Sequence, residues 1–340
     1  MKKAITLGMA LVLVFLGLTA CKKAAATGAD AALALLPKSV EGVVVVDVNK
    51  GMTTAFVDKA IKESKEYQKY LDFVKETGID PQKDVYYLAV GISGISTGTA
   101  EAKTAGVVVV NLKYDKATLI PKLKEKATDV QESVYEGVAL FSAREAEGKD
   151  PTFGAFLDDA RIAVGEEREV KAVIDVFAKK AENVYKNAEL TTLIGKANKA
   201  AMVWAAVQFP PNMMKGVADS NPMASDLADI KAMLLYFDYA GKALQLEIKA
   251  MGGDADKNKK LADTLTGFKA LGSMAGGEKP EIGELINKIE ISSAADAVKI
   301  YANIPEDLLN KLSATATKTV EEKLETAKGE EKKDEKAPIK

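Results

Sequence analysis

The sequence predicts an α+β fold made of two related halves, each with an antiparallel or mixed sheet and with helices packed on one face. Segments with the apolar patterns of strands recur along the chain and are separated by helical segments. Tight turns at Glu136-Gly137 and Ala240-Gly241 join neighbouring strand segments, which indicates hairpins and antiparallel pairing. A similar order of elements follows residue 200. Hairpins mixed with helices favour an α+β plan over a parallel α/β plan.

The first half begins with four consecutive valines at residues 43–46, which predict a strand buried on both faces. Residues 57–74 place apolar side chains on one face of a helix, and Gly78 is expected to end it. Pro121 should kink or split the helix that the pattern predicts around it. The remaining elements expected here are strands at 85–92, 106–112, 138–141 and 161–164, a second hairpin that turns at Asp158-Asp159 before the last of these strands, and helices at 116–126 and 170–181.

The second half begins with a strand at 201–209, which Pro210-Pro211 ends. Residues 244–250 alternate apolar and polar side chains, as in a sheet with one dry face and one wet face. Pro305 suits the first turn of a closing helix. The expected elements are a hairpin of 230–239 with 242–251, a helix carrying Leu261, Leu265, Phe268 and Leu271, and strands at 288–292 and 298–304.

The first twenty residues have the features of an export signal. Lys2 and Lys3 precede an apolar run at residues 5–18, which is too short for the roughly 20 residues of a membrane-spanning helix. The following Leu18-Thr19-Ala20-Cys21 resembles the bacterial lipobox, in which lipid is attached to the cysteine and the chain is cleaved before it. Cys21 is the only cysteine of the chain, which favours lipidation over an ordinary secretory signal with an incidental cysteine.

Lipidation of Cys21 would make the protein membrane-anchored and extracytoplasmic, because several acyl chains hold a protein on a bilayer without a transmembrane helix. Lys22 follows where enteric bacteria use Asp to retain lipoproteins at the inner membrane, so the outer membrane is favoured if the source has one. The expected organisation is a signal peptide at 1–20, a flexible tether at 21–34, α+β domains at 35–198 and 199–313, and a charged, disordered or partly helical tail at 314–340.

The amino-acid composition argues against several kinds of catalytic and metal-binding site. The chain has no histidine, and its one cysteine is assigned to lipid, which argues against disulfides, zinc sites and histidine-dependent triads. The formal charge of −2 is spread over interspersed acidic and basic residues, so no nucleic-acid partner is expected. We therefore expect a non-enzymatic protein without a cofactor or a metal.

Four segments resemble a family of bacterial extracytoplasmic proteins, often lipoproteins, that has no assigned function. They are residues 35–47 (LLPKSVEGVVVVD), 76–85 (ETGIDPQKDV), 161–167 (RIAVGEE) and 298–309 (VKIYANIPEDLL). These are strand starts, caps and turns. The resemblance implies a tandem α+β body outside the cytoplasm but supplies no reaction and no functional residue.

Three segments could carry chemistry, but each also has a structural explanation. Residues 91–98 could cradle an anion, although they match no phosphate-binding pattern and also suit a hairpin loop. Residues 254–265 begin like a calcium loop but lack its required glycine and glutamate, and helix capping by Asp254 explains them better. The acidic pairs Asp158/Asp159 and Glu166/Glu167 could serve a carboxylate hydrolase, but turn and helix-start positions account for them.

Methionine and aromatic residues concentrate in the second half, at Trp204, Phe209, Met213 and Met214. Such side chains suit either an irregular core or a pocket for an apolar ligand. The leading hypothesis is a lipid-anchored protein that binds or scaffolds another envelope component. The alternatives are a carrier for an apolar ligand such as a lipid and, less favoured, a carboxylate-based hydrolase.

Overall fold

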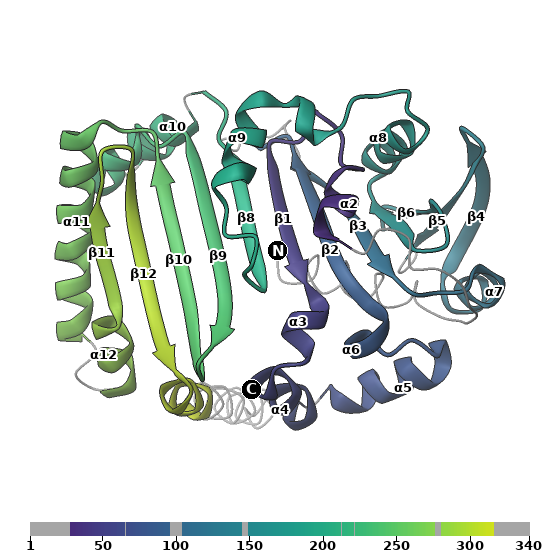
Figure 1. Cartoon of the computed structure of the whole chain (residues 1–340), viewed down its shortest axis with the longest axis horizontal. Coiled ribbons are helices and arrows are strands. Elements are labelled where there is room, and N and C mark those ends of the chain that lie inside the picture. Colours follow the sequence, from purple (N-terminus) through teal and green to yellow (C-terminus); the bar gives the residue numbers. More distant parts are fainter. Residues whose placement is uncertain are drawn as a thin grey trace, which may run out of the picture.

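The structure is a computed structural model, and it describes residues 28–64, 66–95, 104–144, 149–211, 213–220, 222–275 and 280–315. Cys21, the signal peptide and most of the charged tail lie outside these residues. In the described residues, twelve strands form a single sheet in the order β11-β12-β10-β9-β8-β1-β2-β3-β7-β6-β5-β4 (Figure 1). Every neighbouring pair is antiparallel. The predicted α+β class is confirmed.

The strands follow the predicted segments closely, and the hairpin predicted about Asp158-Asp159 is formed by β6 and β7. The other two predicted hairpin turns are also present, with positive φ at Glu136 and Gly137 (50° and 75°) and at Lys242 and Gly241 (58° and 59°). The strands are β1 (Gly42–Asp47), β2 (Val85–Ser93), β3 (Ala105–Leu112), β4 (Thr128–Tyr135), β5 (Val138–Arg144), β6 (Thr152–Phe156), β7 (Arg161–Gly165), β8 (Val203–Gln208), β9 (Ala232–Ala240), β10 (Ala243–Met251), β11 (Ile289–Ser293) and β12 (Ala297–Pro305).

The helices lie on both faces and at the ends of the sheet. They are α2 (Ala29–Leu33), α3 (Val48–Met52), α4 (Ala55–Glu63), α5 (Tyr67–Thr77), α6 (Pro81–Asp84), α7 (Lys116–Lys126), α8 (Glu167–Phe177), α9 (Ala188–Lys196), α10 (Met213–Ser220), α11 (Ala255–Ala275) and α12 (Pro280–Asn287), with 3-10 turns η1 (Val184–Lys186) and η2 (Pro222–Leu227). Residues 306–315 are also helical, directly after Pro305.

Three details differ from the sequence prediction. The single helix expected at 57–74 is divided into α4 and α5, because Ser64 leaves the helical conformation (ψ 141°), although Gly78 ends α5 as predicted (φ 71°). Pro121 lies inside α7 and does not split it. Part of the expected tether is folded as α2, where Ala32 and Leu33 are fully buried. Burying these apolar side chains in the core is more favourable than leaving them in water, as a flexible tether would.

The two predicted halves share one sheet. Strand β8 of the second half pairs with β1 of the first half, and Val45 lies opposite Trp204. The expected boundary between residues 198 and 199 therefore falls just before β8, which hydrogen-bonds to β1 of the first half and to β9 of the second half. Whether each half folds independently stays a prediction.

The main hydrophobic core lies on the sheet face that carries Val43 and Val45, called here the first face. Helices α2, α8 and α9 cover this face, where Leu33, Ile174 and Leu190 are 0% exposed. A smaller core lies on the opposite, second face of the first half, between the strands and Leu119 and Leu123 of α7. In the second half, α11 and α12 pack near the β11 edge (Figure 1).

Candidate functional site

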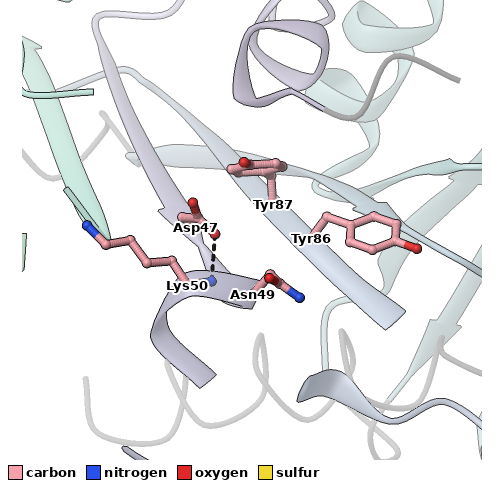
Figure 2. Close-up of a pocket in the computed structure, with 5 residues that line it drawn as sticks. All are labelled: Asp47, Asn49, Lys50, Tyr86 and Tyr87. Atoms are coloured by element: carbon pink, nitrogen blue, oxygen red, sulfur yellow. Dashed lines mark hydrogen bonds between the residues drawn. The ribbon is translucent and has the colours of Figure 1, made fainter. Parts of the chain in front are cut away.

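A polar hollow of about 370 Å³ lies where β1 ends and β2 begins. Asp47, Asn49, Lys50, Tyr86 and Tyr87 line it (Figure 2). Tyr86 and Tyr87 are neighbours on one strand, and Figure 2 shows their rings pointing in different directions. The hollow thus combines a carboxylate, an amide, an ammonium and two phenols.

Asp47 takes its position from a change of secondary structure. It is the last residue of β1 and the N-cap of α3, and its Oδ1 accepts a hydrogen bond of 2.8 Å from the backbone N–H of Lys50. Asp is a favoured N-cap residue because its side chain satisfies a backbone donor that the helix leaves free. The backbone N–H of Asp47 also donates to the carbonyl of Met202 (2.7 Å). This bond extends the pairing of β1 with β8, which joins the two halves of the sheet.

Lys50 connects the hollow to the second half of the sheet. Its Nζ lies 2.7 Å from a carboxylate oxygen of Asp238 on β9 and donates to the carbonyl of Ala200 (2.6 Å). Asp238 is only 16% exposed, and it also accepts a bond of 3.2 Å from the backbone N–H of Met202. The ion pair therefore holds α3, β8 and β9 in a fixed arrangement.

A row of polar side chains runs from the hollow across four strands of the first face. Asp47 lies opposite Tyr87, Tyr87 opposite Asn111, and Asn111 opposite Arg161, on β1, β2, β3 and β7. Directly opposed residues of antiparallel strands place their side chains on the same face.

The next row on this face is entirely apolar. It consists of core residues in the same cross-strand order, namely Val45, Ala89, Val109 and Ala163. The polar row therefore borders the hydrophobic core directly.

Arg161, at the far end of the row, is held by a carboxylate and by two of the covering helices. Its Nε donates to Asp158 (2.8 Å), and a second nitrogen of the guanidinium contacts the same carboxylate oxygen. The guanidinium lies 5.9 Å from the ring centre of Phe177 and 3.5 Å from the carbonyl of Ala31 in α2. Arg161 thus connects the turn before β7 to the covering helices α2 and α8.

Asn111 differs from every other residue of the row. It is 0% exposed, and neither Oδ1 nor Nδ2 has a hydrogen-bond partner. A buried polar group left without a partner costs about 1–3 kcal/mol, so native proteins rarely keep one without a reason. The contrast with Asn258 is direct, because that buried amide donates to the carbonyls of Gly253, Ala294 and Ala295 at 3.2 Å each.

Tyr87 stands between the hollow and Asn111. Burial raises the pKa of the Tyr87 hydroxyl, and the negative charge of Asp47 raises that pKa further. The phenol is therefore neutral at physiological pH and both donates and accepts hydrogen bonds.

The hollow holds several kinds of hydrogen-bonding group. Asp47 is the only carboxylate that lines the hollow, whereas glycoside hydrolysis uses two carboxyl groups on either side of the bond. Within the described residues, no three carboxylates or cysteines gather as a metal site would require. Phenol, amide and carboxylate groups together favour a ligand with hydroxyl or amide groups.

The residues expected from sequence to bind an apolar ligand do not line the polar hollow. Trp204 is 1% exposed and belongs to the main core. Phe209 follows β8 and donates its backbone N–H to the carbonyl of Lys231 (2.8 Å), while Met213 and Met214 begin α10. None of the four lines the polar hollow, and their role in binding stays a prediction.

The acidic pairs occupy turn and helix-start positions. Asp158 accepts the backbone N–H of Ala160 (2.9 Å) in the turn before β7. Glu166 precedes α8, and Glu167 pairs with Lys171 one helical turn later (2.6 Å).

The possible calcium loop at 254–265 and the described part of the possible anion loop at 91–98 both make local hydrogen bonds that account for their polar residues. Asp254 accepts the backbone N–H of Lys257 (2.9 Å) at the start of α11, as expected of a helix cap. Gly91 belongs to β2, and the backbone N–H of Ile95 donates to the Glu41 carboxylate (2.7 Å). Residues 96–98 of the proposed anion loop lie outside the described residues.

Sequence reasoning missed Asn111, although a signal was present. The residue interrupts a strand in which residues 107–110 are all valine, and a buried polar side chain among valines is unusual. Its alignment with Asp47 and Tyr87 depends on strand order and register, which a single sequence does not give.

Comparison with known proteins finds little. No protein-family model matches the chain, and no curated protein sequence matches it. A solved structure of the protein TP0453 in crystal form III is similar, with a TM-score of 0.47 and 10% sequence identity, over 83% of this chain and 97% of that chain. Crystal form I of TP0453 gives a TM-score of 0.45 and 9% identity over 83% and 96% of the two chains. Similarity at this level carries no conclusion about function.

Proposed function

We propose that this chain is a lipid-anchored protein of the bacterial envelope that binds another envelope component without converting it chemically. The anchor is lipid on Cys21, supported by the lipobox-like Leu18-Thr19-Ala20-Cys21 and by the absence of any other cysteine. The protein is extracytoplasmic, and Lys22 after the lipidated residue favours the outer membrane. Among the helices in the described ranges, none is long and apolar enough to cross a bilayer.

The observation that carries the binding proposal is the unpartnered amide of Asn111, which lies on the strand next to Tyr87 of the polar hollow and directly opposite it. A ligand group that enters beside Tyr87, or a water molecule that the ligand orients, gives both atoms of this amide a partner. Asp47 accepts hydrogen bonds at the mouth of the hollow, and Tyr87 donates or accepts between the two. The ligand class is therefore an uncharged compound that carries both hydroxyl and amide groups.

Calorimetry with a disaccharide of N-acetylglucosamine tests this proposal, because that probe carries hydroxyl and amide groups and no charge. Asn111→Leu and Tyr87→Phe should each weaken binding about tenfold, the usual effect of losing one or two hydrogen bonds. Tyr185→Phe is the matched control, since Tyr185 also bonds a carboxylate (Asp30, 2.9 Å) but lies away from the hollow. Equal binding by all four proteins, or no binding by the wild type, would contradict the proposed ligand class.

A carrier for an apolar ligand such as a lipid is the second candidate, and one observation favours it. On the second face of the central strands, Val44, Val46, Val90, Val203 and Leu235 are only partly buried and belong to none of the core clusters of the described residues. A fluorescent fatty acid added to the delipidated protein should bind there, and Val44→Gln should abolish its binding. Unchanged binding by Val44→Gln would exclude this face.

A further inference from the structure

A second hollow lies on the first face of the second half, away from Asp47. It has a volume of about 550 Å³ and lies between the end of α9 and strands β9, β10, β11 and β12. It continues into a smaller hollow of about 90 Å³ that shares Lys196, Leu234 and Lys249 with it. We call the two together the lysine groove.

The groove holds two lysines in direct opposition. Lys249 on β10 pairs in register with Lys299 on β12, so both side chains point to the same face at adjacent positions. Like charges directly opposite each other destabilise a sheet. Lys196, the last residue of α9, adds a third ammonium to the lining.

Protein carboxylates compensate these charges only in part. Lys249 lies 3.1 Å from Glu247, and Lys196 lies 3.8 Å from Asp296, a distance too long for a strong hydrogen bond. Lys299 has no ion pair within the described residues, and its ammonium lies 5.9 Å from the ring centre of Tyr301. Among the residues that the structure describes, no carboxylate therefore pairs with the positive charge of Lys299.

The walls between the ammonium groups are mainly apolar. Leu234, Met251 and Ala297 line the larger hollow beside Lys249 and Lys299. Leu234 is 6% exposed and belongs to the main core, so this wall is fixed. An inorganic anion could pair with the lysines but would leave this surface in contact with water.

We infer that the lysine groove binds an amphipathic anion, a carboxylate or phosphate head joined to a short apolar body. The head lies between Lys299, Lys249 and Lys196, and the body covers Leu234 and Met251. The site rests on neither the polar hollow nor lipid on Cys21, so it goes beyond the proposed function.

Titration with hexyl phosphate, inorganic phosphate and hexanol separates the contributions of head and body. Hexyl phosphate should bind at least tenfold more tightly than inorganic phosphate, because only the ester buries apolar surface. Hexanol should also bind more weakly than hexyl phosphate, because it has no negative charge to pair with the lysines. Hexanol binding as tightly as hexyl phosphate would overturn the anionic class, and inorganic phosphate binding as tightly as the ester would overturn the amphipathic one.

Substitution of single lysines locates the site. Lys299→Gln should weaken hexyl phosphate binding about tenfold, as loss of one hydrogen bond to a charged group does. Without ligand the same variant should melt no lower than wild type, because the opposed charges are gone. Lys196→Gln, outside the sheet, should weaken binding similarly. Lys259→Gln is the control, since Lys259 is 69% exposed on α11 and pairs with Asp263. Wild-type affinity in both groove variants would refute the site.

Discussion

Replacing Asn111 with leucine should make the protein more stable. The two side chains have nearly the same branched shape, and Asn111 is 0% exposed with both polar atoms unpartnered. Removing two unpartnered atoms recovers about 1–3 kcal/mol each. Fitting the slightly larger leucine among packed neighbours costs about 1–3 kcal/mol. At the midpoints of these ranges, about 4 kcal/mol recovered against about 2 kcal/mol lost, the balance is a gain of about 2 kcal/mol, or a rise of roughly 3 °C in the melting temperature for a chain of this size.

Asn258→Leu is the matched comparison, because Asn258 is also buried (4% exposed) but donates to three carbonyl groups. That change should lower stability by about 2–4 kcal/mol, since it leaves buried acceptors unsatisfied. Calorimetric melting and urea unfolding of both variants measure the difference. A loss of stability in Asn111→Leu would mean that the amide already has partners, such as tightly held water, and would refute the reasoning that links it to a ligand.

Three further predictions concern the sheet and its core. Trp204→Ala should cost about 3–5 kcal/mol in urea unfolding because the ring is 1% exposed in the main core, and a loss below 1 kcal/mol would contradict that packing. Gly165→Ala should cost about 3 kcal/mol, since its Cβ would lie 2.5 Å from the carbonyl oxygen of Gly106, and circular dichroism on heating would detect it; an unchanged melting curve would count against the β3–β7 pairing. Burial raises the pKa of Tyr114, so the folded state holds this proton more tightly than the unfolded state, and stability should fall as the pH rises above about 10. Tyr114→Phe should show a shallower alkaline loss, and an identical pH profile would exclude the contribution of Tyr114.

Much of the fold could be predicted from local patterns because those patterns report burial directly. The four valines of β1 and the alternation in β10 correctly identify strands. The prediction that β1 is buried on both faces is wrong, because Val43 and Val45 are buried but Val44 and Val46 on the opposite face are only partly buried. The alternation in β10 does not separate a buried face from an exposed one either, since every residue after Ala243 is partly buried. The order of strands could not be predicted in the same way. The pairing of β1 with β8 joins residues about 160 positions apart, and its register depends on complementary packing around Trp204 rather than on any turn between them.

The candidate site was less accessible from sequence than the fold. Asp47, Tyr87 and Asn111 lie on three strands and come together only through cross-strand register. The opposition of Lys249 and Lys299 has the same origin. Trp204 and the methionines that follow it in the sequence show a second reason why the site was hard to predict. Large apolar side chains suit a core and a pocket equally well, and only their burial distinguishes the two.

The central claim, that lipid on Cys21 anchors this protein in the envelope, is tested most directly by the mass of its N-terminal peptide. The protein should be purified with detergent from the membranes of a lipoprotein-processing bacterium. We expect a chain that begins at Cys21 and carries the added mass of a diacylglyceryl group, with or without a third acyl chain. The Cys21→Ser variant should lack this mass and leave the membrane fraction. An unmodified Cys21 in the membrane-associated protein would contradict it.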